Sequence, residues 1–151
     1  MKAHEMMIRE VYKVKEDDTV KTVIEKFIKY RISGLPVVND RNEIVGYISD
    51  GDVMRYIGKR KDIYLDNIYY SFVIKDDMED FEERERRLLE LNVLEIARKK
   101  IVTVDWQETI EEIAALLGNR QIKKVPVIRK GVLVGIISRG DIIRHAFKSL
   151  I

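Results

Sequence analysis

The sequence predicts an α+β fold in which one strand–helix–strand–strand–helix (βαββα) unit is present twice. The segment Gly46–Arg55 has a second copy at Gly135–Arg144, and in both an apolar strand ends at a serine before a helix begins near an aspartate. The spacing of the copies is regular, since Pro36 and Pro126 are 90 positions apart. Such regularity indicates a duplicated supersecondary unit. Each copy is too small to bury its own sheet, so we expect the two to pack together about a pseudo-two-fold axis.

The elements of both copies follow from hydrophobic spacing and turn residues. In the first copy, residues 1–58, they are an extended piece at 11–14, a helix capped by Thr19 with apolar positions from Val20 to Ile28, a hairpin of Leu35–Val38 and Ile44–Ile48, and a helix from Ser49 to about Gly58. In the second copy, residues 92–151, they are an extended piece at 102–104, a helix whose Thr109 and Glu112 match a capping box, a hairpin of Val125–Ile128 and Val132–Ile137, and a helix over Asp141–Lys148.

Between the copies lies an insertion, residues 59–91, whose two halves differ in composition. Its first half contains an aromatic and apolar stretch, Ile63–Val73, which either docks on the core, forms a subunit contact or shields a ligand cleft. Its second half, Asp76–Glu90, is dominated by charge, and we expect it to be a solvated helix. The basic run Arg98–Lys100 that follows is typical of a solvated helix end.

The composition limits the classes of function. Of the 151 residues, 46% are hydrophobic and 36% are charged, yet the net charge is only +2, which argues against a dedicated nucleic-acid-binding protein. There is no cysteine, so disulfides and a thiol nucleophile are excluded. Met1–Glu10 is too charged for a signal peptide, and no apolar run approaches the roughly 18 residues that a membrane helix needs. We therefore expect a soluble cytoplasmic protein.

The duplicated unit resembles the tandem cystathionine-β-synthase (CBS) domain pair, also called a Bateman module. The resemblance rests on the apolar-Pro-Val strands at Pro36 and Pro126, and on the Gly-apolar-apolar-Ser-x-x-Asp endings that follow them. It covers most of the chain outside the insertion. Asn92–Ala97 is similar to the short lead-in helix that such domains carry, and Ala3–Met7 is its counterpart in the first copy.

The resemblance implies a regulatory or sensory module that binds AMP, ADP, ATP or S-adenosylmethionine in the cleft between the paired domains, with no catalytic cofactor. In the family the motif aspartate holds the ribose hydroxyls, which assigns that role to Asp52 and Asp141. The serine three residues earlier reaches the phosphates, which assigns Ser49 and Ser138. A carboxylate can accept both hydrogens of a ribose diol, and N–H groups at a helix start suit phosphate oxygens.

The resemblance also implies where the adenine lies, namely against the segment before each Pro-Val strand. The residues assigned to this adenine pocket are Ile32, Ser33, Gly34, Leu35, Ile122, Lys123, Lys124 and Val125, together with Thr103, whose position often contacts the ligand.

The two copies differ at several of these positions. Lys13 stands where the second copy has Thr103, and Arg139 stands where the first copy has Asp50. The resemblance implies two potential sites; because Arg139 favours an anion and Asp50 disfavours one, the site of Asp141, with Arg139 beside the phosphate, is the one expected to take a charged nucleotide if only one does. Uncharged or cationic ligands are penalised less near Asp50.

Other classes of function have weaker support. The sequence shows no nucleophile–base pair, no P-loop and no cluster of metal ligands, so we expect neither an enzyme nor a metal site. A Ser-x-x-Asp sequence is also close to a helix capping box, which needs no ligand. One alternative is a module that dimerises or docks on an effector protein, with vestigial clefts; a homodimer is expected in either case. Nucleic-acid binding through Arg120, Lys123 and Lys124 is less favoured.

Overall fold

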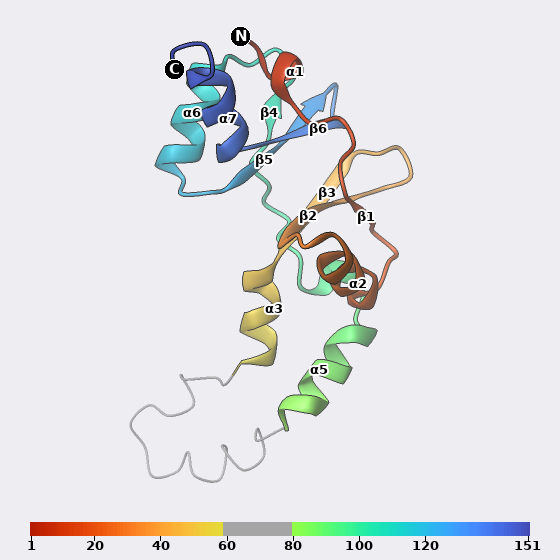
Figure 1. Ribbon diagram of the computed structural model, residues 1–151. Helices are drawn as coiled ribbons and strands as arrows, with labels where there is room; N and C mark the ends of the chain where they lie inside the picture. Colours follow the sequence, from red (N-terminus) through yellow and green to blue (C-terminus); the bar gives the residue numbers. More distant parts are fainter. Residues whose placement is uncertain (59–79) are drawn as a thin grey trace, which may run out of the picture.

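The computed structural model describes residues 1–58 and 80–151, which form two three-stranded sheets with helices packed against them (Figure 1). In each sheet the first strand is parallel to the second, and the second and third form an antiparallel hairpin. The first sheet comprises β1 (Val14–Lys15), β2 (Gly34–Val38) and β3 (Ile44–Ser49). The second comprises β4 (Val104–Asp105), β5 (Lys124–Arg129) and β6 (Val132–Ser138).

Each sheet is accompanied by one helix between its first two strands and one after its third. These helices are α2 (Val20–Tyr30) and α3 (Asp50–Ile57) in the first copy, and α6 (Ile110–Asn119) and α7 (Arg139–Phe147) in the second. The remaining helices are α1 (Ala3–Met6), α5 (Phe81–Glu90) and the 3₁₀ helix η2 (Val93–Glu95). The α+β fold with two βαββα-like repeats is therefore confirmed. The aromatic stretch at 63–73 and the first part of the charged segment lie outside the described residues.

The two central helices begin and end as their sequences indicate. The Thr109 hydroxyl accepts a hydrogen bond from the Glu112 N–H at the start of α6, whereas Thr19 caps α2 without a side-chain bond. At the other end, Arg31 and Gln121 both have a φ of 53°, a left-handed conformation that stops the helical ladder. These two residues are 90 positions apart, so the repeat extends to the backbone conformation.

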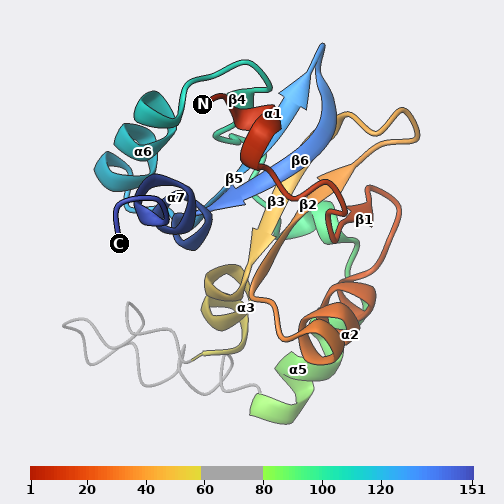
Figure 2. The ribbon, with the colours of Figure 1, turned by 45° about the horizontal axis from the view of Figure 1, so that its top comes forward.

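The lead-in segments are exchanged between the repeats, which the sequence order does not show. Residues 1–8 pack on the second repeat, where the Ala3 N–H donates to the Glu108 carbonyl at 2.8 Å and Ile8 pairs with Ile136. Ala3 and Met6 are buried in the core of that repeat with Val104 and its neighbours. Figure 2 shows α1 beside β6, although they lie at opposite ends of the chain.

The second lead-in makes the reciprocal exchange. Val93 is fully buried in the core of the first repeat, and its N–H donates to the Asp18 carbonyl at 3.0 Å. Arg98 then pairs with Tyr47 on β3, as Ile8 does with Ile136 on β6. Each repeat therefore completes its core with a segment that precedes the other repeat, and neither sheet is covered by its own copy alone.

The charged half of the insertion is anchored more firmly than its composition suggests. Leu88 on α5 is only 2% exposed and packs with Val20 of α2 and Val53 of α3. The expected solvated helix thus has one apolar position that extends the core of the first repeat. Within 1–58 and 80–151, no helix is long and apolar enough to cross a membrane.

Candidate ligand-binding cleft between the repeats

A cleft of about 240 Å³ lies where the two repeats meet. It is lined by residues from three places: the first repeat, the linker that leads into β4, and the segment that leads into β5 of the second repeat. These residues are Ser33, Gly34, Tyr47, Ser49, Asp50, Arg98, Lys100, Ile101, Val102, Ile122, Lys123, Lys124 and Pro126. The cleft is therefore built from distant parts of the chain that only the packing of the two repeats brings together.

One wall is the turn between β3 and α3. Ser49 is the N-cap of α3, and the Asp50 N–H donates to the Ser33 carbonyl at 2.8 Å, which fixes the turn against the segment before β2. Gly34 pairs directly with Ser49 across the sheet. The first N–H groups of this helix are already bonded, that of Asp50 to the Ser33 carbonyl and that of Gly51 to the Asp50 carboxylate, so the turn offers the cleft the positive end of the helix dipole.

Tyr47 lies over Gly34 in the same wall. A Cβ on Gly34 would be 2.7 Å from the Tyr47 hydroxyl, so a larger residue at position 34 would clash with the tyrosine side chain. Burial, and next the charge of Asp50, raise the pKa of Tyr47 to about 12, so the phenol stays neutral at physiological pH. The ring thus offers the cleft an apolar face with a hydroxyl donor at its edge.

The opposite wall comes from the second repeat and is basic. Lys123 lies directly before β5 and Lys124 is the first residue of that strand, while Arg98 and Lys100 come from the linker. The Ser-x-x-Asp turn of one repeat thus shares a cleft with the pre-proline segment of the other. Four cationic side chains therefore line the cleft, against a single lining carboxylate, that of Asp50.

The motif aspartates are buried, and both secure a helix start. Asp52 is 7% exposed; its Oδ2 accepts from the Ser49 N–H at 2.9 Å, and its Oδ1 forms an ion pair with Arg55. Oδ1 also lies 3.7 Å from Nε of Arg98, which lines the cleft. Asp52 is not itself a lining residue, but it is one ion pair away from the cleft.

Asp141 has the same capping role in the second copy. Its Oδ2 accepts from the Ser138 N–H at 2.8 Å, its Oδ1 from Arg144 at 2.6 Å, and its own N–H donates to the Ser138 hydroxyl. Burial opposes ionisation, but the bonds from Ser138 and Arg144 outweigh it and hold the pKa of Asp141 below its usual value. The capping-box interpretation therefore holds for both copies. Of the two motif aspartates, only Asp52 contacts a residue that lines the cleft.

Other candidate residues serve the fold rather than line the cleft. The Arg139 guanidinium donates to the Ile122 carbonyl at 2.8 Å and to the Leu117 carbonyl at 2.9 Å, so it caps the end of α6. Leu35 and Val125 are fully buried in the two cores, and Ile32 packs against the first of them. Thr103 is half-buried next to lining residue Val102.

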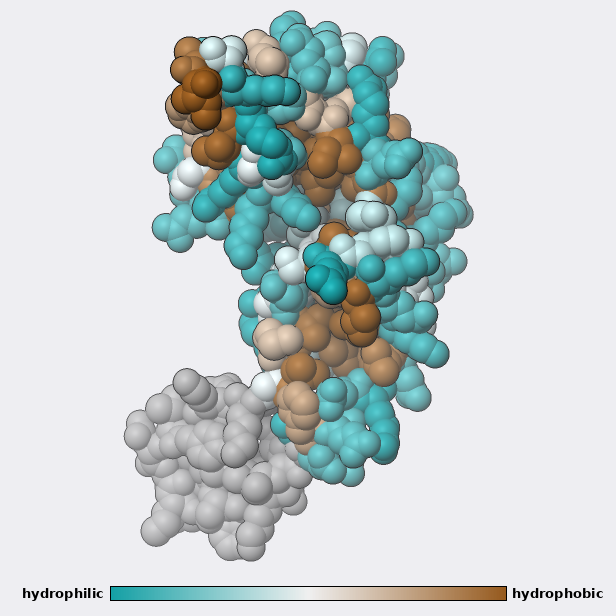
Figure 3. All heavy atoms as spheres, in the orientation of Figure 1, coloured by the Kyte–Doolittle hydropathy of each residue, from teal (hydrophilic) through white to brown (hydrophobic). Residues whose placement is uncertain are grey.

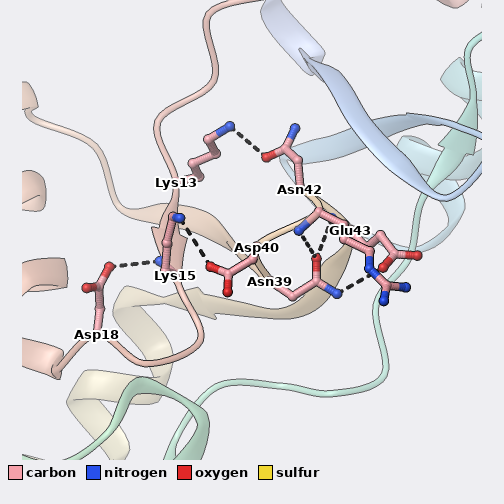
Figure 4. A network of polar contacts seen from close by, with 8 residues as sticks. Lys13, Lys15, Asp18, Asn39, Asp40, Asn42 and Glu43 are labelled. Carbon is pink, nitrogen blue, oxygen red and sulfur yellow. Dashed lines mark hydrogen bonds and ion pairs between the residues drawn. The ribbon is translucent and has the colours of Figure 1, made fainter.

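Lys13, the counterpart of Thr103, takes part in a polar network at the tip of the first hairpin (Figure 4). Its ammonium group donates to Oδ1 of Asn42 at 2.6 Å, and Nδ2 of Asn42 donates in turn to the Leu133 carbonyl at 2.9 Å. Asn42 has a φ of 60°, which this turn requires. The network therefore joins the hairpins of the two repeats, at the end of β3 opposite to the Ser49–Asp50 turn.

Sequence reasoning missed several lining residues, above all Tyr47, Arg98 and Lys100. Tyr47 could have been found from strand alternation, because it lies two residues before Ser49 and shares its face of β3. Arg98 and Lys100 carry no such signal: as a basic run they resemble a solvated helix end, and only the exchanged lead-in places them in the cleft.

Comparison with known proteins identifies the class to which this geometry belongs. Residues 3–59 and 93–148 match the model of the CBS domain. The chain therefore belongs to the CBS domain family and contains a tandem pair of CBS domains. The uncharacterized protein MJ1426 of Methanocaldococcus jannaschii is 31% identical over 150 residues, which are 91% of this chain and 89% of that protein.

Solved structures share the fold. CBSX2 from Arabidopsis thaliana superposes with a TM-score of 0.76 at 21% identity, covering 99% of this chain and 96% of that one. The structure of CBSX2 in complex with AMP superposes with a TM-score of 0.73 at 22% identity, covering 97% of both chains. A CBS pair of this fold thus binds AMP in at least one protein.

CBS pairs similar to this one also occur inside enzymes. Inosine-5'-monophosphate dehydrogenase of Methanocaldococcus jannaschii is 27% identical over 145 residues, which are 95% of this chain but only 23% of that enzyme. The region of similarity therefore makes up a minor part of the enzyme, whereas MJ1426 matches this chain along most of its length.

Proposed function

We propose that this protein is a regulatory module that binds an adenosyl ligand, AMP, ADP, ATP or S-adenosylmethionine, in the cleft between its repeats. The observation that carries the proposal is the convergence of a helix start at Ser49, an aromatic side chain at Tyr47 and the basic wall at Lys123–Lys124 around one cavity. An aromatic face suits an adenine ring, and the positive end of a helix dipole with nearby cations suits phosphates. The AMP complex of CBSX2, which has the same fold, supports the ligand class.

In this proposal the ligand joins the two repeats. Its base and phosphates contact both walls, and the carboxylate of Asp52 accepts from the ribose hydroxyls once the exposed Arg55 and Arg98 side chains move aside. A ligand that contacts both repeats binds one of their relative arrangements better than another, and only this difference in affinity can produce regulation.

A thermal-shift panel of AMP, ADP, ATP, S-adenosylmethionine and NAD tests binding. A ligand present at 100 times its Kd adds about 2.7 kcal/mol to the free energy of unfolding. We expect at least one adenosyl compound to raise the melting temperature. No response to any of them at millimolar concentration would contradict the proposal.

A matched pair of variants tests the location of the site. Asp52→Asn and Asp141→Asn remove equivalent capping carboxylates, but only Asp52 lies beside the described cleft. We expect Asp52→Asn to reduce the ligand-induced shift and Asp141→Asn to preserve it, with Asp40→Asn, on an exposed hairpin, as a neutral control. If Asp141→Asn reduces the shift and Asp52→Asn preserves it, the site lies instead at the Ser138–Asp141 turn, which the sequence favoured because of Arg139.

A second candidate function is self-association, as the sequence analysis expected. Met54 on α3 and Ile143 on α7 are 56% and 58% exposed, and they occupy equivalent positions of the two repeats. Figure 3 shows further apolar surface near the C-terminus, where Phe147, Leu150 and Ile151 are exposed. We propose a homodimer through this helical face. Sedimentation equilibrium of Met54→Glu with Ile143→Glu should show a monomer, and a variant that remains dimeric would exclude this face.

A further inference from the structure

The cleft contains cations without counterions. No hydrogen bond or ion pair joins the ammonium groups of Lys100, Lys123 or Lys124 to any other residue in 1–58 or 80–151, and all three line the cavity. Lys124 is half-buried, so its charge is only partly screened by solvent. Unpaired like charges that face one cavity repel each other, and this repulsion is relieved when an anion enters.

The other charges of the site do not cancel this excess. Asp50 is exposed, and among the residues that the structure describes its carboxylate accepts only from the neighbouring Gly51 N–H, at 2.8 Å. Asp52 is shared between Arg55 and Arg98, so its charge is already compensated. Of the five charged lining residues four are cations, and three of those have no partner among the described residues.

We infer that the cleft selects nucleoside polyphosphates, ADP and ATP, over AMP and disfavours S-adenosylmethionine, and that Lys100, Lys123 and Lys124 determine this selectivity. The inference rests on the proposed function and specifies its ligand class. Each additional phosphate brings negative charge to the basic wall, whereas S-adenosylmethionine brings a sulfonium cation and no phosphate. The selectivity comes entirely from the second repeat and its linker, because the equivalent residues of the first repeat, Ser33 and Gly34, are uncharged.

Isothermal titration calorimetry of the full chain tests the inference, with AMP, ADP, ATP and S-adenosylmethionine in EDTA so that each nucleotide keeps its full charge. We expect ATP to bind at least about tenfold more tightly than AMP, and its advantage to shrink as salt is added. S-adenosylmethionine should bind most weakly. Equal affinities for AMP and ATP, or tightest binding of S-adenosylmethionine, would overturn the inference but leave the proposed function standing. Absence of heat with all four compounds would instead remove the proposed function.

Charge-removing variants test the residues. Lys123→Met with Lys124→Met should weaken ATP binding by about tenfold and AMP binding by less than about threefold, because AMP has fewer charges to lose. Lys100→Met should act in the same direction. Lys99→Met is the matched control, since Lys99 is adjacent and exposed but does not line the cleft. An equal loss in Lys99→Met and Lys100→Met would show that the net charge of the protein, not the cleft, sets the affinity.

The same variants separate a binding role from a structural one. Since the three lysines have no partners in the described part of the chain, their removal should leave the melting temperature of the ligand-free protein unchanged or slightly higher. A variant that melts lower without ligand and binds ATP normally would assign the lysines to the fold and overturn the inference.

Discussion

The two buried aspartates combine structural and functional roles in single side chains. Asp52 and Asp141 each satisfy the N–H of the serine that starts the following helix, and each forms an ion pair with an arginine one turn later. A motif that is required for a helix start can therefore persist where no ligand binds. The two aspartates differ in their neighbours. Arg98 pairs with Asp52 and lines the cleft, whereas the residue equivalent to Arg98 in the other lead-in is the uncharged Ile8.

Asp141 should make the stability depend on pH in the acid range. Its pKa is lowered in the folded protein, so its stabilising effect is complete above the ordinary pKa of an aspartate, about 3.9, and is lost as the pH falls through the folded value. Asp141→Asn should lower the free energy of unfolding by about 1 kcal/mol at pH 7, a typical capping contribution. Urea denaturation at pH 7 and pH 2.5 measures this; a difference that persists undiminished at pH 2.5 would contradict the assignment.

At the scale of the elements, the exchanged lead-ins distribute each core over both ends of the chain. The existence and order of helices and strands followed from hydrophobic spacing, because each copy repeats the same pattern. The exchange did not, since nothing in Ala3–Met7 or Asn92–Ala97 encodes which sheet it will cover. The same is true of α5, whose charged sequence conceals one buried position, Leu88.

Met6→Ala should destabilise the second repeat rather than the first. Met6 is 4% exposed in the core that contains Val104 and Ile113, and truncation of a buried methionine costs about 2–5 kcal/mol. Hydrogen exchange should show greater loss of protection in β5 and β6 than in β2 and β3. Loss confined to the first repeat would refute the exchange of lead-ins.

Leu88→Ala tests whether α5 belongs to the core of the first repeat. Removal of this 2% exposed side chain from its contacts with Val20 and Val53 should cost about 2–5 kcal/mol in chemical denaturation. Glu85→Ala, at an exposed position of the same helix, should change stability by no more than about 0.5 kcal/mol. Similar small effects from both variants would mean that α5 is only a solvated connector.

For the molecule as a whole, the two repeats depend on each other. A fragment of residues 92–151 lacks Ala3 and Met6 and leaves Val93 without the core that buries it. We expect this fragment to lack stable tertiary structure, and its NMR spectrum to have the narrow amide dispersion of an unfolded chain. A well-dispersed spectrum with cooperative unfolding would show that a single repeat is self-sufficient.

The duplication could be read from the sequence, but the cleft could be read only in part. The residue types at the Ser-x-x-Asp turns and before the prolines were visible as candidates, and Ser33, Gly34, Ser49 and Ile122–Lys124 do line the cavity. Which residues face each other depends on how the two repeats pack. Asp50 alone made the first turn look unfavourable for an anion, but the packing brings four cations to the same cleft. A linear motif cannot show that Asp50 is opposed by cations from the other repeat.

The most direct measurement is a crystal structure of the protein grown with ATP. We predict that the nucleotide lies between the Ser49–Asp50 turn and the Ile122–Lys124 segment, with its ribose toward Asp52 and its phosphates toward the lysines. A nucleotide bound on another surface, or contacting one repeat alone, would contradict the account.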